Sequence, residues 1–170
     1  DQAGAAERAL HYYTLAGDAA YDSFANLEAI DQYTHAIKIA AHTPALTDSA
    51  QLIQLYTRRG RALEHSGFYE RARDNYADMQ QTAQQRADRS MELAALIANT
   101  TIHVAPTSLR NAEIGQAVST RALTVARELN DRAAQAKIFW NLVLLHRHLG
   151  DVDLSIEYGE QSIALARELN

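Results

Sequence analysis

The sequence contains no cysteine, only two prolines and only seven glycines among its 170 residues. The lack of cysteine excludes disulfides, thiolate zinc sites and cysteine nucleophiles, and it fits a reducing, cytoplasmic compartment. Few prolines and glycines argue against an all-β or loop-rich fold, because strands need frequent turns. No apolar run approaches the length of a membrane span, and the N-terminus does not have the pattern of a signal peptide. We therefore expect a cytoplasmic, helical protein without a membrane partner.

The composition is that of an ordinary globular chain, with 47% apolar and 22% charged residues. The net charge is −5, and residues 1–50 carry seven acidic but only two basic residues. Nucleic-acid binding depends on Lys and Arg contacts to phosphates, and the chain has no long basic stripe. The sequence therefore predicts no nucleic-acid partner.

Positive evidence comes from an internal repeat. The segment Ala-Arg-Glu-Leu-Asn at residues 126–130 returns unchanged at residues 166–170, a shift of 40 positions. Periods of this size are typical of stacked helical hairpins, in which each unit buries its apolar face against its neighbours. The repeat therefore indicates architecture more directly than it indicates a partner.

The clearest unit begins with an amphipathic helix expected over residues 51–63 and ends with a second helix expected from about Tyr69. Gly67 and Phe68 separate the two. Small residues, Gly60 and Ala72, stand where the two helices must approach closely. Large residues are expected to fill the space beside them: Tyr56, Tyr69 and Tyr76. The residues at helical spacing are Leu52, Leu55, Tyr56, Arg59 and Leu63 in the first helix, and Ala72, Tyr76 and Met79 on one face of the second.

This unit resembles the tetratricopeptide repeat family, whose signature alternates large and small residues at fixed spacings. The matching positions are Tyr56, Gly60, Leu63, Gly67-Phe68-Tyr69, Ala72 and Tyr76, and the match departs at Met79, where a small residue is usual. The resemblance implies an all-α fold of four helical hairpins, about eight antiparallel helices, in a right-handed superhelix. It implies one repeat domain over residues 1–170, with units at about 3–42, 49–85, 88–129 and 131–170.

The other units follow the same scheme less closely. Their matching positions are Tyr13, Gly17, Ala20, Ala29, Tyr33 and Ala36; Gly115, Ser119 and Ala122; and Phe139, Leu142, His146, Gly150, Ser155, Gly159 and Ser162. The spacing exceeds the roughly 34 residues of the standard repeat, so we expect longer helices or longer loops. Asp48 or Ser49 is the expected N-cap of the second unit, and 130–131 that of the fourth. A longer loop in the third unit contains Pro106.

A narrower resemblance covers about 25 residues of the first unit. The run from Leu15 to Ala20, the run from Phe24 to Ile30, and then Tyr33 and Ala36-Ile37 are similar to the start of the repeat array in large bacterial signalling ATPases. This resemblance implies a piece of a larger polypeptide, in which other domains of the same chain are possible partners. The start and end of the sequence within helices agree with that expectation.

Catalytic patterns are missing. The sequence has no nucleophile elbow, no phosphate-binding Gly-rich loop and no HExxH, and its carboxylate pairs are scattered on helix surfaces. Histidines occur at the same position of three units: His65, His103 and His148. They could form a row of imidazoles that binds metal or senses pH, or they could be three separate histidines at solvated helix ends. Adjacent repeats stand about 10 Å apart, whereas metal ligands lie about 2 Å from the ion. We therefore expect solvated helix ends, no metal, no cofactor and no enzyme.

Binding residues are transferred from the family's groove, which the first helix of each hairpin lines. The resemblance assigns this groove to His11, Thr14, Asp18, Tyr21, Asp22, Gln54, Thr57, Arg61, Glu64, His65, Asn99, His103, Lys137, Trp140, Leu144, Arg147 and His148. This polar set with aromatic anchors suits a peptide, although the family's Lys/Asn carboxylate clamp is not recognisable. Trp140 either faces the groove or packs on the preceding repeat.

These observations favour a non-catalytic protein–protein interaction or regulatory sensor module of a multidomain bacterial signalling protein. Its concave groove would bind a peptide, a domain or a small effector. The alternative is a structural self-association module, in which the open ends of the repeat array stack into a homo-oligomer.

Overall fold

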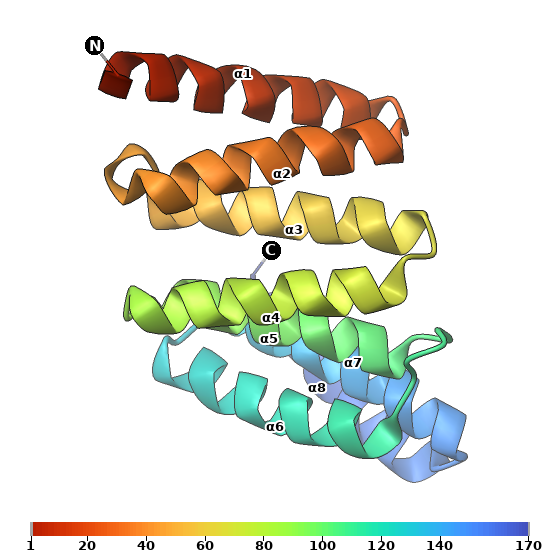
Figure 1. The fold of residues 1–170 in the computed structure, drawn as a ribbon. Coiled ribbons are helices and arrows are strands. Elements are labelled where there is room, and N and C mark those ends of the chain that lie inside the picture. The colour runs from red at the N-terminus through yellow and green to blue at the C-terminus, as the bar shows by residue number, and fades with distance from the viewer. Residues whose placement is uncertain (1, 170) are drawn as a thin grey trace. The chain divides into compact units, whose positions relative to one another are not determined.

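The computed structural model describes residues 2–169, with side chains from residue 4 onward, and within that range it is all-α (Figure 1). These residues form eight α-helices and one short 3-10 helix, η1, and no strand. The elements are α1 (Gln2–Asp22), α2 (Asn26–His42), η1 (Pro44–Leu46), α3 (Ser49–His65), α4 (Tyr69–Gln85), α5 (Arg89–Val104), α6 (Ala112–Glu128), α7 (Arg132–Leu149) and α8 (Val152–Glu168). The prediction of an all-α fold with about eight helices is confirmed.

The helices belong to two compact units, Asp1–Thr82 and Ala83–Asn170. In unit 1, α2 packs against both α1 and α3, so that consecutive helices form antiparallel hairpins (Figure 1). In unit 2, α5 packs on α6, α6 on α7, and α7 on α8, while α5 also contacts α7. Within each unit, a helix therefore buries its apolar face against its neighbours in the sequence, as a helical repeat requires.

Carboxylate and amide side chains set the starts of five helices. The side chains of Asp48, Asp88, Asn111, Asp131 and Asp151 each accept a hydrogen bond from the backbone N–H three residues on. Asp48 also forms a capping box, because the Gln51 side chain returns a bond to its backbone N–H. Each such cap stabilises its helix by about 1 kcal/mol. The predicted N-caps at Asp48 and at 130–131 are confirmed.

One turn type ends five helices. Phe24, Gly67, Ala87, Asn130 and Gly150 all have positive φ, between 51° and 78°. In each turn the next residue donates its N–H to a carbonyl five positions back, as in Phe68 to Leu63 (2.9 Å). The turn is thus fixed by helix geometry and hydrogen bonding, and glycine occupies it at two of the five positions.

Glycines inside the helices allow large side chains of the neighbouring helix to pack closely. A Cβ at Gly17 would lie 2.7 Å from the Tyr33 ring, and one at Gly60 would lie 2.3 Å from the Tyr76 ring. Both tyrosines are almost fully buried, as is Met79, where the family signature expects a small residue. The predicted pairing of Gly60 with large residues in the second helix is therefore confirmed.

The core of unit 2 is aliphatic. Each of the helices α5, α6 and α7 contributes buried residues to it, among them Leu93, Leu96, Ile138 and Leu142. The small positions predicted in α6, Gly115, Ser119 and Ala122, are buried against this core. In α8, Ser155 and Ser162 donate to backbone carbonyls of α7, at 3.3 and 2.9 Å. Small residues again mark the places where two helices approach closely.

Candidate functional site

Helices α1 and α3 direct polar side chains onto one surface of unit 1, where Asp18 is the shared acceptor. The Nη1 atom of Arg58 lies 2.9 Å from Asp18 Oδ1, and the Tyr33 hydroxyl donates to the same oxygen at 2.7 Å. Gln54 Nε2 donates to Asp18 Oδ2 at 3.5 Å. A second carboxylate, Asp22, lies 3.9 Å from Arg58. The network therefore joins the predicted groove residues Asp18 and Gln54 directly.

Burial raises the pKa of the Tyr33 hydroxyl, and its hydrogen bond to the Asp18 carboxylate raises this pKa further. The Tyr33 hydroxyl therefore keeps its proton at neutral pH, and it donates from α2 to the Asp18 carboxylate. The carboxylate therefore keeps one orientation while Arg58 and Gln54 bind it from α3.

The same surface continues along α3 with aromatic and ionic contacts. The rings of Tyr21 and His65 stack with centroids 6.2 Å apart, and the Arg58 guanidinium lies 5.6 Å from the Tyr21 centroid. Arg61 pairs with Glu64 at 3.0 Å, and Glu64 accepts the Tyr76 hydroxyl at 2.6 Å. We name this surface the α1/α3 face. It comprises Asp18, Tyr21, Gln54, Arg58, Arg61, Glu64 and His65.

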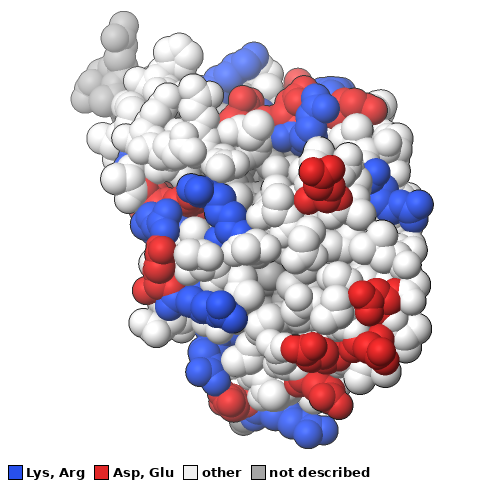
Figure 2. Space-filling view, turned by 90° about the horizontal axis from the view of Figure 1, so that it is seen from below, with Lys and Arg blue, Asp and Glu red and all other residues white. Residues whose placement is uncertain are grey.

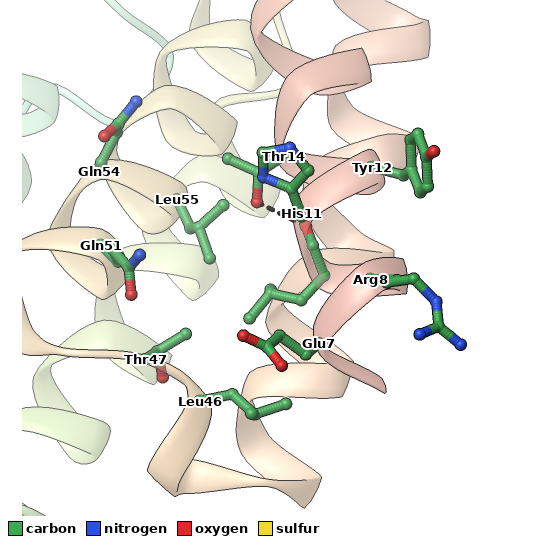
Figure 3. Close-up of a pocket in the computed structure, with 11 residues that line it drawn as sticks. Glu7, Arg8, His11, Tyr12, Thr14, Leu46, Thr47, Gln51, Gln54 and Leu55 are labelled. Atoms are coloured by element: carbon green, nitrogen blue, oxygen red, sulfur yellow. Dashed lines mark hydrogen bonds between the residues drawn. The ribbon is translucent and has the colours of Figure 1, made fainter. Parts of the chain in front are cut away.

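A cavity of about 570 Å³ adjoins the α1/α3 face, and Gln54 belongs to both (Figure 3). Leu55 points from α3 toward α1, and Glu7 points from α1 toward Leu46 and Thr47. The lining consists of Glu7, Arg8, Leu10, His11, Tyr12, Thr14, Leu46, Thr47, Gln51, Gln54 and Leu55. This cavity thus brings together three of the predicted groove residues, His11, Thr14 and Gln54.

The cavity has an apolar floor and a polar rim. Leu10 and Leu55 are buried, Leu46 is partly buried, and exposed Glu7 and His11 stand at the opening. Arg8 and Tyr12 point away from it (Figure 3). Such a site suits an apolar side chain whose backbone or neighbours form hydrogen bonds at the rim.

The remaining predicted residues of unit 1 lie beside these groups. Thr57 is partly buried on α3, Asp22 is exposed, and Thr14 donates to the carbonyl of Leu10 at 2.8 Å. The Thr14 hydroxyl therefore already has an acceptor within its own helix.

The predicted residues of unit 2 form a separate group along one face of α7. Lys137, Arg147 and His148 are exposed, Leu144 is partly buried, and Trp140 is 55% exposed. Trp140 is therefore not part of the core of unit 2, where its neighbour Phe139 packs instead. The Asn99 side chain on α5 is partly buried, and its Oδ1 has no hydrogen-bond donor.

The expected series of solvated histidines is wrong at His103. His65 and His148 are exposed, but His103 is buried, with Nδ1 2.9 Å from the carbonyl oxygen of Leu109. The longer loop after α5, which contains Pro106, folds back over this helix end and covers the imidazole. In the part of the chain that the structure describes, no group of three or more His, Asp or Glu residues is placed to hold a metal ion.

Sequence reasoning missed Arg58 and the cavity residues Glu7, Leu46 and Gln51. Arg58 follows Gln54 by one helical turn, so helical periodicity places it on the same face, although the resemblance did not assign it to the groove. Leu46 lies in η1, a short segment without a periodic pattern, and only the tertiary structure brings it to α1.

Charge is mixed on the surface: Figure 2 shows Lys and Arg side chains intermingled with Asp and Glu on the face that it draws. None of the helices between residues 2 and 169 combines the length and apolarity needed to cross a bilayer. Comparison of the sequence with protein-family models and with curated proteins gives no match. The geometry of the α1/α3 face and its cavity is therefore the main guide to function.

Proposed function

We propose that the chain is a tetratricopeptide-like binding module that acts by recognition rather than by catalysis. Its ligand is a peptide segment, or an exposed loop of another domain, that lies along the α1/α3 face. The observation that carries this proposal is the cavity of about 570 Å³ beside Gln54, which has leucines at its floor and polar groups at its rim. An anchor side chain enters a hollow of this kind, and polar neighbours fix the backbone of the peptide.

The ion pairs of the α1/α3 face support recognition of a polar segment. Asp18 already has three partners, so its face is preorganised and loses little side-chain entropy when a ligand binds. Tyr21 is partly buried and His65 is exposed beside it, and such stacked rings are frequent binding anchors.

The resemblance of the first unit to bacterial signalling ATPases supports the further proposal that the module belongs to a larger signalling protein. In a larger cytoplasmic signalling protein, occupancy of the α1/α3 face would be the event that a neighbouring domain reads. A domain of the same polypeptide is then as suitable a ligand as a separate protein.

A displayed library of random peptides tests the proposal. Peptides selected on the wild-type chain are measured again on His11→Trp, which fills the cavity from an exposed position. Lys38→Trp, on the exposed surface of α2, is the matched control. We expect His11→Trp to weaken binding at least tenfold, about 1.4 kcal/mol, and Lys38→Trp to leave it unchanged. Selected peptides that bind His11→Trp as tightly as wild type would refute the cavity as the site.

The open face of α8 favours a second candidate function, self-association. The 40-residue repeat aligns Gln116 and Leu123 of α6 with Ile156 and Ile163 of α8. In α6, Gln116 Oε1 lies 3.2 Å from His146 of α7, and Leu123 packs against the core. Ile156 and Ile163 are 57% and 53% exposed. The face that α7 covers on α6 is thus uncovered on α8.

A second copy of this chain supplies a matching surface through α1, whose Tyr12 and Leu15 are exposed. Packing of α1 from one copy on α8 of another would be a head-to-tail contact, which extends into rings or filaments. Light scattering over a concentration series tests this candidate. Self-association predicts a mass above 18.8 kDa that returns to the monomer value in Ile156→Glu/Ile163→Glu. A constant monomer mass in the wild type would refute it.

A further inference from the structure

Unit 1 has a second cavity, of about 270 Å³, which shares no lining residue with the α1/α3 cavity. Helices α2, α3 and α4 form it, with α3 running between the other two (Figure 1). Its lining residues are Ile30, Thr34, Arg59, Leu63, Arg71, Asp74, Asn75 and Asp78. We name it the α2/α4 cavity.

The Arg59 guanidinium is held in place at this cavity by neutral groups. Its Nε donates to Asn75 Oδ1 at 2.6 Å, and its Nη1 lies 3.5 Å from Thr34 Oγ1. Asn75 is buried, and its Nδ2 donates to the Tyr56 carbonyl at 2.9 Å, so its side chain has one orientation. The guanidinium also lies 5.4 Å from the Tyr56 ring centroid. Its position is therefore fixed before any ligand arrives.

Among the described residues, the Arg59 guanidinium nevertheless has no carboxylate in direct contact, and Asp78 of the same cavity acts on it only at longer range. In the part of the chain that the structure describes, no carboxylate forms an ion pair with it, and Asp74 of the same cavity pairs with Arg73 at 2.7 Å. Burial lowers the pKa of Arg59. A partly buried cation without a direct ion pair is unfavourable. Of its five N–H donors, Asn75 and Thr34 engage only two.

We infer that the α2/α4 cavity binds a carboxylate that is carried by a short aliphatic group, with Arg59 as its anchor. Guanidinium groups match the planar carboxylate with two parallel hydrogen bonds. Arg71 lines the same cavity and adds positive charge, while Ile30 and Leu63 provide the apolar contact. The Asp78 carboxylate on the opposite helix repels a phosphate dianion more strongly than a monovalent carboxylate, which decides between these two anions.

Sodium valerate is the test ligand, and its uncharged amide, valeramide, is the matched control. Binding is followed by NMR on the Arg59 Nε–H and the Asn75 side-chain amide, because both groups lie at the site. We expect saturable shifts with valerate at a Kd on the order of millimolar, none with valeramide, and weaker binding of inorganic phosphate. Arg59→Gln should abolish the response of Asn75.

Two further variants keep the bond between Arg59 and Asn75 and test charge alone. Asp78→Asn should tighten valerate binding about threefold, and Arg71→Gln should weaken it by a similar factor. Arg127→Gln, on the exposed surface of α6, should change nothing. A purely structural role for Arg59 predicts no valerate response in any of these proteins. Equal responses to valerate and valeramide, or tighter binding of phosphate, would overturn the inference.

Discussion

The ring of Tyr76 on α4 packs directly over the Cα atom of Gly60 on α3, where a Cβ atom would come within 2.3 Å of the ring. The hydroxyl of the same tyrosine reaches Glu64 one turn further along α3, at 2.6 Å. One side chain therefore sets both the approach of α3 to α4 and the orientation of a carboxylate on the α1/α3 face. The packing of the hairpin and the geometry of the candidate site are physically linked.

Gly60→Ala should destabilise unit 1. In an open helix a Gly→Ala change stabilises by about 0.5–1 kcal/mol, but overpacking against Tyr76 costs about 1–3 kcal/mol. Urea unfolding followed by circular dichroism measures the net loss. Gly159→Ala is the control, because its nearest contact would be Val143 at an ordinary 3.8 Å. A Gly60→Ala protein as stable as Gly159→Ala would contradict the close packing described here.

The shared turn predicts opposite effects of two substitutions. Gly67 has φ 75° and open space around the position of a Cβ, so Gly67→Ala should cost about 1–2 kcal/mol through backbone strain alone. Ala87 already carries that strain at φ 51°, so Ala87→Gly should stabilise by about 0.4–1 kcal/mol. Thermal unfolding of the two variants provides the measurement. Shifts of the same sign would show that the turn does not require positive φ.

Glu92 should make unit 2 sensitive to acid. Burial alone would raise its pKa, but hydrogen bonds from Arg121 and Arg89 outweigh burial, so the pKa is lowered. A lowered folded-state pKa adds stability above the unfolded-state value, and this contribution disappears as the pH falls through the folded-state value.

The expected result for Glu92→Gln is a lower free energy of unfolding at neutral pH and a weaker decline between about pH 5 and pH 3. Urea unfolding followed by fluorescence of Trp140, the single tryptophan, reports on unit 2. Exposed Glu113→Gln is the control. If the free energy of unfolding falls equally steeply with pH in wild type and Glu92→Gln, Glu92 is not a source of the acid sensitivity.

Tyr33 makes the opposite prediction at alkaline pH. The folded-state pKa of Tyr33 is raised. Its contribution to the free energy of unfolding is therefore fully present below the unfolded-state pKa of about 10, and it is lost as the pH rises from there through the folded-state pKa. Tyr33→Phe, which removes the bond to Asp18, should therefore cost about 1–2 kcal/mol near neutral pH. This difference should shrink above about pH 10, as denaturant titrations at several pH values would show. A stability difference that does not change with pH would mean that Tyr33 has the same pKa in the folded and unfolded chains.

Local features of the sequence predicted most of the fold. Asp48 and Asp131 are capping residues whose partners lie three positions away, and Gly67 and Gly150 end their helices through their own backbone freedom. Such signals act within a few residues, so one sequence suffices to read them. The predicted start of the fourth helix at Tyr69 is confirmed for the same reason.

The candidate site was only partly predictable. The resemblance to the tetratricopeptide groove located Asp18 and Gln54, but it passed over Arg58, which lies one helical turn after Gln54. The contribution of Leu46 to the cavity depends on the path of η1. The burial of His103 depends on the loop that carries Leu109. Both are tertiary relationships between an irregular segment and a helix, and no local pattern specifies them.

The proposed binding function is tested most directly by locating a selected peptide on the chain. Isotope-labelled protein is titrated with a peptide taken from the displayed library, and amide chemical shifts are followed by NMR. The account predicts that the largest changes occur around the α1/α3 cavity, at His11, Gln54 and Leu55, and that they are absent in His11→Trp. Changes confined to α8, around Ile156 and Ile163, would contradict it.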